Sequence, residues 1–251
     1  MTLRGALSPS IFTADGIDVS GRNITITNAT VTNFDDALCV KPLSGSDVLS
    51  QCSEAIVIKD SRVFLGVGLS VGSVRPSATI NCVRNVTFTN ITLTSPIKGI
   101  HVKPNPGTVG TGVIDDITYE NITATDPLWW GIFVNPQQQV QPGGGTNTGC
   151  DFLFPLPNTT CPTQPRVPVT RLTLRNIYVT GALLSPGLLR CNSTGPCSGW
   201  RFENVNVTSS TNWPAGPAFY CSEKGSIVNS TWLNVVPPLD DCFGVPADSG
   251  A

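Results

Sequence analysis

Three aspartates in the first part of the chain could together carry acid–base chemistry. Asp15 lies 20 residues before Asp35, which is followed directly by Asp36. That separation is close to one coil of a parallel β-solenoid, where equivalent positions of neighbouring coils lie about 4.8 Å apart. Carboxylates crowded in this way raise at least one pKa and so separate an acid from a base. Hydrolysis of a glycosidic bond needs one carboxyl as acid and another as base. The alternative is that each aspartate only caps a turn, which is the more common role for a single aspartate at a solenoid bend.

The chain that positions these aspartates contains a repeated strand–turn–strand unit. Apolar residues alternate with Thr or Asn at a period of two, which indicates strands, and no segment sustains the period of a helix. The unit recurs at residues 22–33, 55–63, 84–94, 116–124, 171–179 and 200–207. Such a unit cannot bury its apolar face alone and must stack on copies of itself.

The spacing of the copies predicts an all-β fold, a right-handed single-stranded parallel β-helix. The anchors Ile24, Ile56, Val86 and Ile117 follow one another at intervals of 32, 30 and 31 residues, so we expect them to stack in the interior. Asparagine at the repeated turn can adopt left-handed backbone angles and bond to the asparagine of the next coil. The alternative is an antiparallel sandwich, but hairpin signals are missing apart from Asp15-Gly16.

We expect a single domain over residues 1–251, with two segments that break the repeat. Residues 135–168 are rich in Gln, Pro and Gly, which indicates a long loop closed by its own disulfide. Residues 209–251 are expected to cover the last coil, because the open edge strands of a solenoid could otherwise pair with other chains.

The cysteines indicate an oxidising compartment. Nine cysteines without a Cys-x-x-Cys pair, together with one histidine, favour disulfides over a zinc site, and we expect no metal and no cofactor. The expected pairs are Cys150–Cys161, Cys191–Cys197, Cys221–Cys242 and Cys52–Cys82, which leaves Cys39 over.

Nine Asn-x-Ser/Thr sequons agree with the cysteines. They lie at Asn23, Asn28, Asn85, Asn90, Asn121, Asn158, Asn192, Asn206 and Asn229. Asn and Thr are also common in solenoid turns, but sequons and cysteines together predict a secreted glycoprotein. Met1 is not followed by an apolar leader, so we expect that a leader was removed or that the chain begins partway through a longer protein.

The chain is poor in charge. Charged residues make up 13% of it, roughly half of the usual share, and the net charge is −2 without a run of Lys or Arg. Nucleic acid and anionic membranes are therefore not expected as partners. No apolar stretch approaches the ~18–20 residues of a membrane span, and we expect a monomer.

Four short motifs make the chain recognisable. They read Asp-Gly-Ile-Asp at 15–18, Asn-Phe-Asp-Asp at 33–36, Gly-Val-Gly-Leu-Ser-Val-Gly-Ser at 66–73 and Gly-Ile-His-Val-Lys at 99–103. In this order they resemble the Asn-Thr-Asp-Gly, Asp-Asp, Gly-His-Gly-Leu-Ser-Ile-Gly-Ser and Arg-Ile-Lys motifs of the polygalacturonases, the pectin-cleaving glycoside hydrolases of family 28. The resemblance covers roughly residues 10–140 and is weaker in the later coils.

The resemblance implies an inverting hydrolase of galacturonate-containing pectin. Asp35 falls at the position of the acid, and Asp15 and Asp36 fall at the positions of the base. His101 and Lys103 fall where the family binds the carboxylate of the substrate. The resemblance also implies a parallel β-helix with an acidic cell-wall polysaccharide as its partner.

Departures from the family pattern predict weak or specialised hydrolysis. Thr13 stands where the family has Asn, Val67 where it has the His that assists the acid, and His101 where it has Arg. Because an unperturbed His loses its charge between about pH 5 and pH 8, substrate binding is expected to weaken over that range. Only 14 residues precede Asp15, which indicates an N-terminally truncated chain.

A second function remains open at this point. The chain could be a non-catalytic or weakly active β-helix that binds cell-wall polysaccharide, with Trp129, Trp130 and Lys103 in a groove. Tryptophan can stack on a sugar, but one member of such a pair usually belongs to the core.

Overall fold

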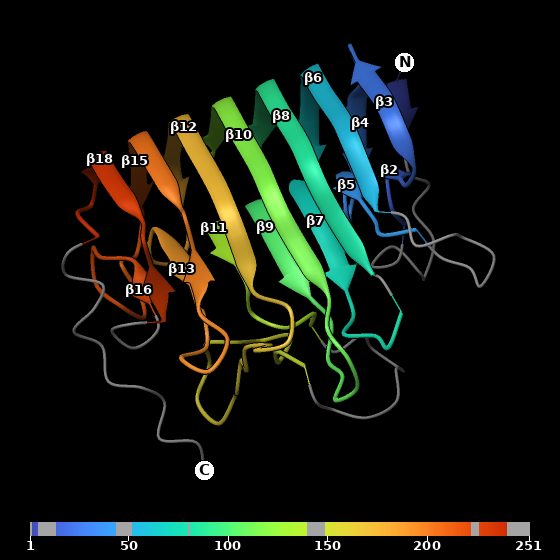
Figure 1. Ribbon diagram of the computed structural model, residues 1–251. Helices are drawn as coiled ribbons and strands as arrows, with labels where there is room; N and C mark the ends of the chain where they lie inside the picture. Colours follow the sequence, from blue (N-terminus) through green and yellow to red (C-terminus); the bar gives the residue numbers. More distant parts are fainter. Residues whose placement is uncertain are drawn as a thin grey trace.

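The computed structural model describes residues 2–4, 14–43, 52–79, 81–139, 149–221 and 226–239. These residues form strands and connecting loops without a helix. Every pairing between the strands is parallel, and the chain winds through two sheets that stack coil on coil (Figure 1). The predicted right-handed parallel β-helix is therefore confirmed.

The first sheet, sheet A, follows the sequence across the molecule, and its long strands lie side by side in Figure 1. Its strands are β1 (Thr2–Arg4), β3 (Arg22–Thr27), β4 (Thr30–Asn33), β6 (Ser53–Leu65), β8 (Cys82–Thr94), β10 (Val113–Thr125), β12 (Val169–Ala182), β14 (Cys197–Ser198), β15 (Arg201–Ser209), β17 (Ile227–Val228) and β18 (Thr231–Val236). Each long strand contains the predicted turn as a residue with positive φ, such as Asn90 in β8 and Asn121 in β10.

The second sheet, sheet B, is narrower and positions the candidate site. Its strands are β2 (Ile17–Val19), β5 (Leu38–Val40), β7 (Leu69–Val74), β9 (Lys98–Pro104), β11 (Trp130–Val134), β13 (Gly187–Leu189) and β16 (Tyr220–Cys221). They follow one another in the order β16-β13-β11-β9-β7-β5-β2. One face of this sheet closes the core, and the other carries the chemistry described below.

The interior between the sheets is filled by stacked apolar residues. The predicted anchors pair in register, Ile24 with Ile56, Ile56 with Val86, and Val86 with Ile117. The last three of these side chains are at most 1% exposed, so each contributes on the order of 1.5–3 kcal/mol of hydrophobic stabilisation. The intervals of 32, 30 and 31 residues between these anchors thus each correspond to one coil.

An asparagine ladder follows the predicted turn from coil to coil. Asn176 donates from Nδ2 to Oδ1 of Asn121 at 2.9 Å, Asn204 donates to Asn176 at 3.1 Å, and Asn234 donates to Asn204 at 3.1 Å. All four asparagines have φ between 53° and 54°. Left-handed angles cost asparagine little, so the repeated residue both forms the turn and ties neighbouring coils.

Three of the predicted disulfides are confirmed. The bonds Cys52–Cys82, Cys150–Cys161 and Cys191–Cys197 are present, and Cys39 is a buried free thiol as expected. The predicted pair Cys221–Cys242 involves Cys242, which lies outside the described residues.

The segment that follows residue 209 adds strands to the solenoid. Strand β16 pairs with β13, β17 with β14 and β18 with β15, so the described part of the expected cover forms a further coil. Residues 240–251, the rest of that segment, lie outside the described part of the chain. Within the described ranges, the structure has no helix with the length and apolar character of a membrane span.

Candidate active site

The three candidate aspartates lie where the chain turns into sheet B. Asp15 stands shortly before β2, and Asp35 and Asp36 occupy the bend between β4 and β5. Carboxylate oxygens of all three lie within 4.8 Å of one another. Successive residues of a regular strand point to opposite faces, so the bend is what allows two adjacent aspartates to share one place.

Close backbone contacts hold these turns together. Gly16 N donates to the carbonyl oxygen of Asp36 at 2.7 Å, and Val67 N donates to that of Asp35 at 2.6 Å. Gly68 has a φ of +33°, and a Cβ there would lie 1.9 Å from the carbonyl oxygen of Gly99. Only glycine fits this approach, so the glycines of the sequence motifs serve the close stacking of the coils beneath the aspartates.

Asp35 has the environment of a proton donor. Its carboxylate is half-buried, and its Oδ1 accepts a hydrogen bond from Asp36 N at 2.8 Å. Burial is the main cause that raises the pKa of Asp35, and the negative charges of Asp36 and Asp15 raise it further. A carboxyl with a raised pKa holds its proton at higher pH, which is what a general acid requires.

Asp36 has the opposite environment although it is the next residue. Its side chain is 2% exposed, and its Oδ2 accepts hydrogen bonds from Lys103 Nζ at 2.6 Å and Lys41 Nζ at 2.8 Å. Ser70 Oγ donates to its Oδ1 at 2.8 Å. Burial alone would raise its pKa, but the two ammonium groups outweigh burial and hold the pKa of Asp36 well below its usual range. Asp36 therefore stays ionised.

Lys103, which the resemblance placed at the carboxylate of the substrate, reaches Asp36 and is buried. Its side chain is 4% exposed, and its ammonium contacts Asp36. Lys41 was missed by the sequence reasoning and is the more accessible cation, with 29% of its side chain exposed. It also lies 3.5 Å from Asp18 Oδ2. Lys41 follows β5 by one residue, and this position brings its side chain to Asp36. No sequence motif pointed to it.

His101 lies on β9 and is buried, with neither ring nitrogen bonded to a partner in the described part of the chain. Its ring meets Phe133 edge-on at 5.4 Å between centroids. Burial lowers the pKa of His101 well below the usual value, and the charges of Lys98 and Lys103 lower it further. The expected loss of a charge between pH 5 and pH 8 is therefore wrong, because this imidazole is already neutral there.

Two further titratable groups near the site were missed by the sequence reasoning. Burial raises the pKa of Asp18 to about 6. The charge of Lys41 opposes this increase, and the charges of Asp15 and Asp36 add to it. Burial and then the charge of Lys103 lower the pKa of Lys98 to about 7. Neither shift could be read from the sequence, because both depend on which residues of other coils surround the group.

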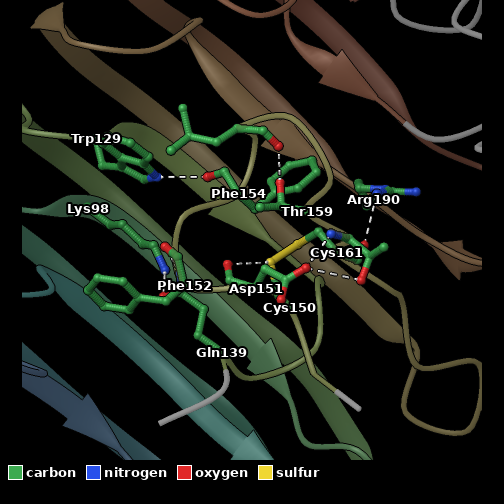
Figure 2. The surroundings of a disulfide bond; sticks show 12 residues. Lys98, Trp129, Gln139, Cys150, Asp151, Phe152, Phe154, Thr159, Cys161 and Arg190 are labelled. Carbon is green, nitrogen blue, oxygen red and sulfur yellow. Dashed lines mark hydrogen bonds between the residues drawn. A yellow bond between two sulfur atoms is a disulfide. The ribbon is translucent and has the colours of Figure 1, made fainter. Parts of the chain in front are cut away.

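The disulfide loop covers the outer face of sheet B next to the site. Figure 2 shows the bond Cys150–Cys161 and the contacts that fasten the loop, including Lys98 Nζ to Gln139 Oε1 at 2.5 Å. Trp129 Nε1 donates to the carbonyl oxygen of Phe154 at 3.0 Å (Figure 2). The predicted loop closed by its own disulfide is present, and its residues 140–148 lie outside the described part of the chain.

The tryptophan pair divides as the sequence reasoning anticipated. Trp130 is fully buried and packs with Phe133 beneath the disulfide loop, whereas Trp129 is partly buried. A sugar-stacking role is therefore excluded for Trp130. Of the two substituted motif positions other than His101, Val67 lies beside Asp35 through its backbone N–H, and Thr13 lies outside the described residues.

The site combines a protonatable carboxyl with an ionised one, and a third carboxyl lies within 4.8 Å of both. Asp35 can hold a proton, Asp36 cannot at ordinary pH, and Asp15 is exposed beside both. An acid and a base placed together in this way suit the hydrolysis of a glycosidic bond, which needs protonation of the leaving oxygen and activation of a water.

Comparison with known proteins places the chain in a family. Residues 10–223 match the family model for the glycosyl hydrolases family 28. The chain is 34% identical over 227 residues to endopolygalacturonase I of Aspergillus aculeatus, covering 82% of this chain and 51% of the relative. It is also 34% identical over 211 residues to a polygalacturonase of Cochliobolus carbonum, covering 80% of this chain and 50% of the relative. The chain thus spans about half the length of these curated relatives.

A solved structure shares the fold. The crystal structure of an endo-xylogalacturonan hydrolase from Aspergillus tubingensis superposes with a TM-score of 0.58 at 16% identity, covering 93% of this chain and 57% of that one. The parallel β-helix and its converging aspartates thus occur in a chain with the family's sequence signature. This protein belongs to family 28 of the glycosyl hydrolases.

Proposed function

We propose that this chain is a glycoside hydrolase that cleaves galacturonate-containing pectic polysaccharide with inversion at the anomeric carbon. The observation that carries the proposal is the opposite shift of two adjacent carboxyl groups, with the pKa of Asp35 raised and that of Asp36 lowered. Asp15 completes a group of three within 4.8 Å. The relatives named endopolygalacturonase and polygalacturonase support the class of substrate.

The proposed reaction assigns one role to each aspartate. Asp35 donates its proton to the glycosidic oxygen. This oxygen departs from the anomeric carbon and keeps the electron pair of the broken bond. A water held by Asp15 and Asp36 gives one proton to one of these two carboxylates while its oxygen forms the new bond to that carbon. Protons then exchange with solvent, which restores the acid on Asp35.

The spacing of the carboxylates suits a water held between the two bases. Two hydrogen bonds of about 2.8 Å can bridge oxygens up to about 5.6 Å apart, which includes the separation found here. In an inverting pair the acid and the base usually lie roughly 6.5–9.5 Å apart, whereas Asp35 lies within 4.8 Å of both bases here, so the proposal of inversion rests on the family resemblance and not on this spacing. Attack by Asp36 itself is disfavoured because the carboxylate is buried and bonded to Lys103, Lys41 and Ser70.

The proposed substrate contacts come from sheet B. Lys103 fixes the charge of Asp36 and provides positive potential for the carboxylate of a galacturonate residue. His101 is kept as a proposed substrate-side residue on the family resemblance alone, because both of its ring nitrogens are buried and its ring packs against Phe133. Because Val67 cannot assist proton transfer, we keep the expectation of weak or specialised hydrolysis.

The proposed setting is extracellular. The three disulfides that join described residues, together with nine sequons, support a secreted glycoprotein. Eight of the nine sequon asparagines are exposed, and Asn192 is half-buried. We further propose a monomer that works without metal or cofactor on an acidic cell-wall polysaccharide.

Release of reducing sugar from polygalacturonate tests the proposal. The purified chain should release it at mildly acidic pH, and Asp35→Asn should abolish release while binding of an oligogalacturonate persists. Binding without release by the unmodified chain would instead indicate a non-catalytic polysaccharide-binding β-helix.

A further inference from the structure

A single buried amide touches the backbone beside all three aspartates. Asn33 is the last residue of β4 and is 2% exposed. Its Nδ2 donates to the carbonyl oxygens of Ala14 at 3.0 Å, Asp35 at 2.9 Å and Asp36 at 2.8 Å. An amide nitrogen has two hydrogens, so at least one of them is shared between two acceptors.

The three acceptors belong to the segments that carry the acid and the bases. Two are carbonyl oxygens of Asp35 and Asp36, and the third is that of Ala14, the residue before Asp15. Asn33 thus joins segments from two successive coils. The backbone bond from Gly16 to Asp36 links the same coils but does not reach Asp35.

The orientation of this amide is determined by its surroundings. A flipped amide would point its oxygen at three carbonyl oxygens, so the nitrogen must face them. Oδ1 of Asn33 is buried without a hydrogen-bond partner in the described part of the chain. It lies against Gly66, where an added Cβ would be 2.2 Å away. A buried acceptor without a partner is unfavourable, so the position is maintained at a cost to stability.

From these contacts we infer that Asn33 is a positioning residue, which clamps the backbone of Asp15, Asp35 and Asp36 so that their mutually repelling carboxylates stay together. The inference rests on the proposed function for its catalytic consequence. Without the clamp, like charges favour separation, and water enters between them. Asp35 then loses the burial and the neighbours that make it an acid.

The contacts distinguish this role from that of an ordinary structural amide. Gln164 provides the comparison within the same chain, because it is also buried and its Nε2 donates to the carbonyl oxygens of Asn105 at 3.2 Å and Gly107 at 3.1 Å. Those acceptors lie beyond β9 and not beside the aspartates. Loss of either amide should lower stability, but only loss of Asn33 should change the titration of Asp35.

The test compares Asn33→Ala and Asn33→Ser with Gln164→Ala. The first readout is the pKa of the Asp35 carboxyl, followed by NMR without substrate, so that it does not depend on activity. We expect it to fall toward the ordinary aspartate value in Asn33→Ala, to fall less in Asn33→Ser, whose hydroxyl keeps one donor, and to stay unchanged in Gln164→Ala.

The second readout is turnover of polygalacturonate. We expect kcat to fall about 100-fold in Asn33→Ala with KM changed about twofold or less, because misplacement of catalytic groups affects the transition state more than binding. The alkaline limb of the pH profile should move to lower pH.

An unchanged Asp35 titration in a folded Asn33→Ala protein overturns the inference. Failure of both Asn33 variants to fold while Gln164→Ala folds also overturns it, because the role is then structural. Absence of turnover in the unmodified chain refutes the proposed function instead, and the titration still decides the role of Asn33.

Discussion

Removal of Lys103 should destabilise the protein far more than removal of Lys41, although both lysines contact the same oxygen of Asp36. The ammonium groups lie 2.6 Å and 2.8 Å from Oδ2, so their direct attractions are similar, about 6 kcal/mol each at an effective dielectric constant of about 20. The difference lies in burial, since the side chain of Lys103 is 4% exposed and that of Lys41 is 29% exposed.

Burial determines the expected loss of stability. Breaking a buried pair leaves Asp36 charged without its main partner, which costs about 3–5 kcal/mol, so we expect this loss for Lys103→Met. For Lys41→Met, solvent screening limits the loss to about 1 kcal/mol. Lys59→Met is the control, because Lys59 lies on sheet A with 44% of its side chain exposed, 4.0 Å from Asp60.

The effect of pH gives the sharper test. In the unmodified protein the pKa of Asp36 is lowered, so its stabilising contribution is present above the unfolded value of about 3.9 and is lost only as pH falls through the lower folded value. In Lys103→Met burial raises the pKa of Asp36, so protonation relieves the unpaired charge. The loss of stability, measured by urea unfolding, should therefore be smaller at pH 4 than at pH 7. Equal losses for both lysines, or a loss that grows toward pH 4, would refute the reasoning.

Four further outcomes follow from the same contacts. Turnover should decline as pH rises through the raised pKa of Asp35, and Asp35→Asn should show no turnover at any pH while it still binds oligogalacturonate in calorimetry; residual turnover in that variant speaks against Asp35 as the acid. Val67→His should leave kcat unchanged or raise it, because position 67 adjoins Asp35 and valine cannot assist a proton; a large decrease contradicts this. His101→Gln should bind oligogalacturonate with the same pH dependence as the unmodified chain, because the imidazole is neutral, and a pH dependence lost with His101 would show that it was charged. Replacing Cys52 and Cys82 by Ser should lower the free energy of unfolding by about 2–4 kcal/mol, and an unchanged urea midpoint argues against this bond.

The fold was largely predictable because apolar residues and turn asparagines repeat along the sequence once per coil. Ile56, Val86 and Ile117 recur at the length of a coil, and stacking in register follows from that repeat alone. The turn asparagines were predictable for the same reason, since each occupies the same place in its copy.

The carboxylates of the site were predictable, but the residues that determine their charges were not. Ser70 and Lys103 bond to Asp36 across 34 and 67 residues of sequence, and nothing in their local sequence specifies that contact. The neutrality of His101 likewise depends on burial against Phe133 of the next coil. Asn33 was visible only as part of a motif, because its role lies in which carbonyl groups its amide reaches.

The configuration of the first product tests the central claim most directly. NMR spectra recorded during hydrolysis of an oligogalacturonate should first show the anomer opposite in configuration to the bond that is cleaved, because water held by Asp15 and Asp36 attacks while Asp35 protonates the leaving oxygen. A first product with retained configuration, or no product from the unmodified chain, would contradict the three-aspartate account.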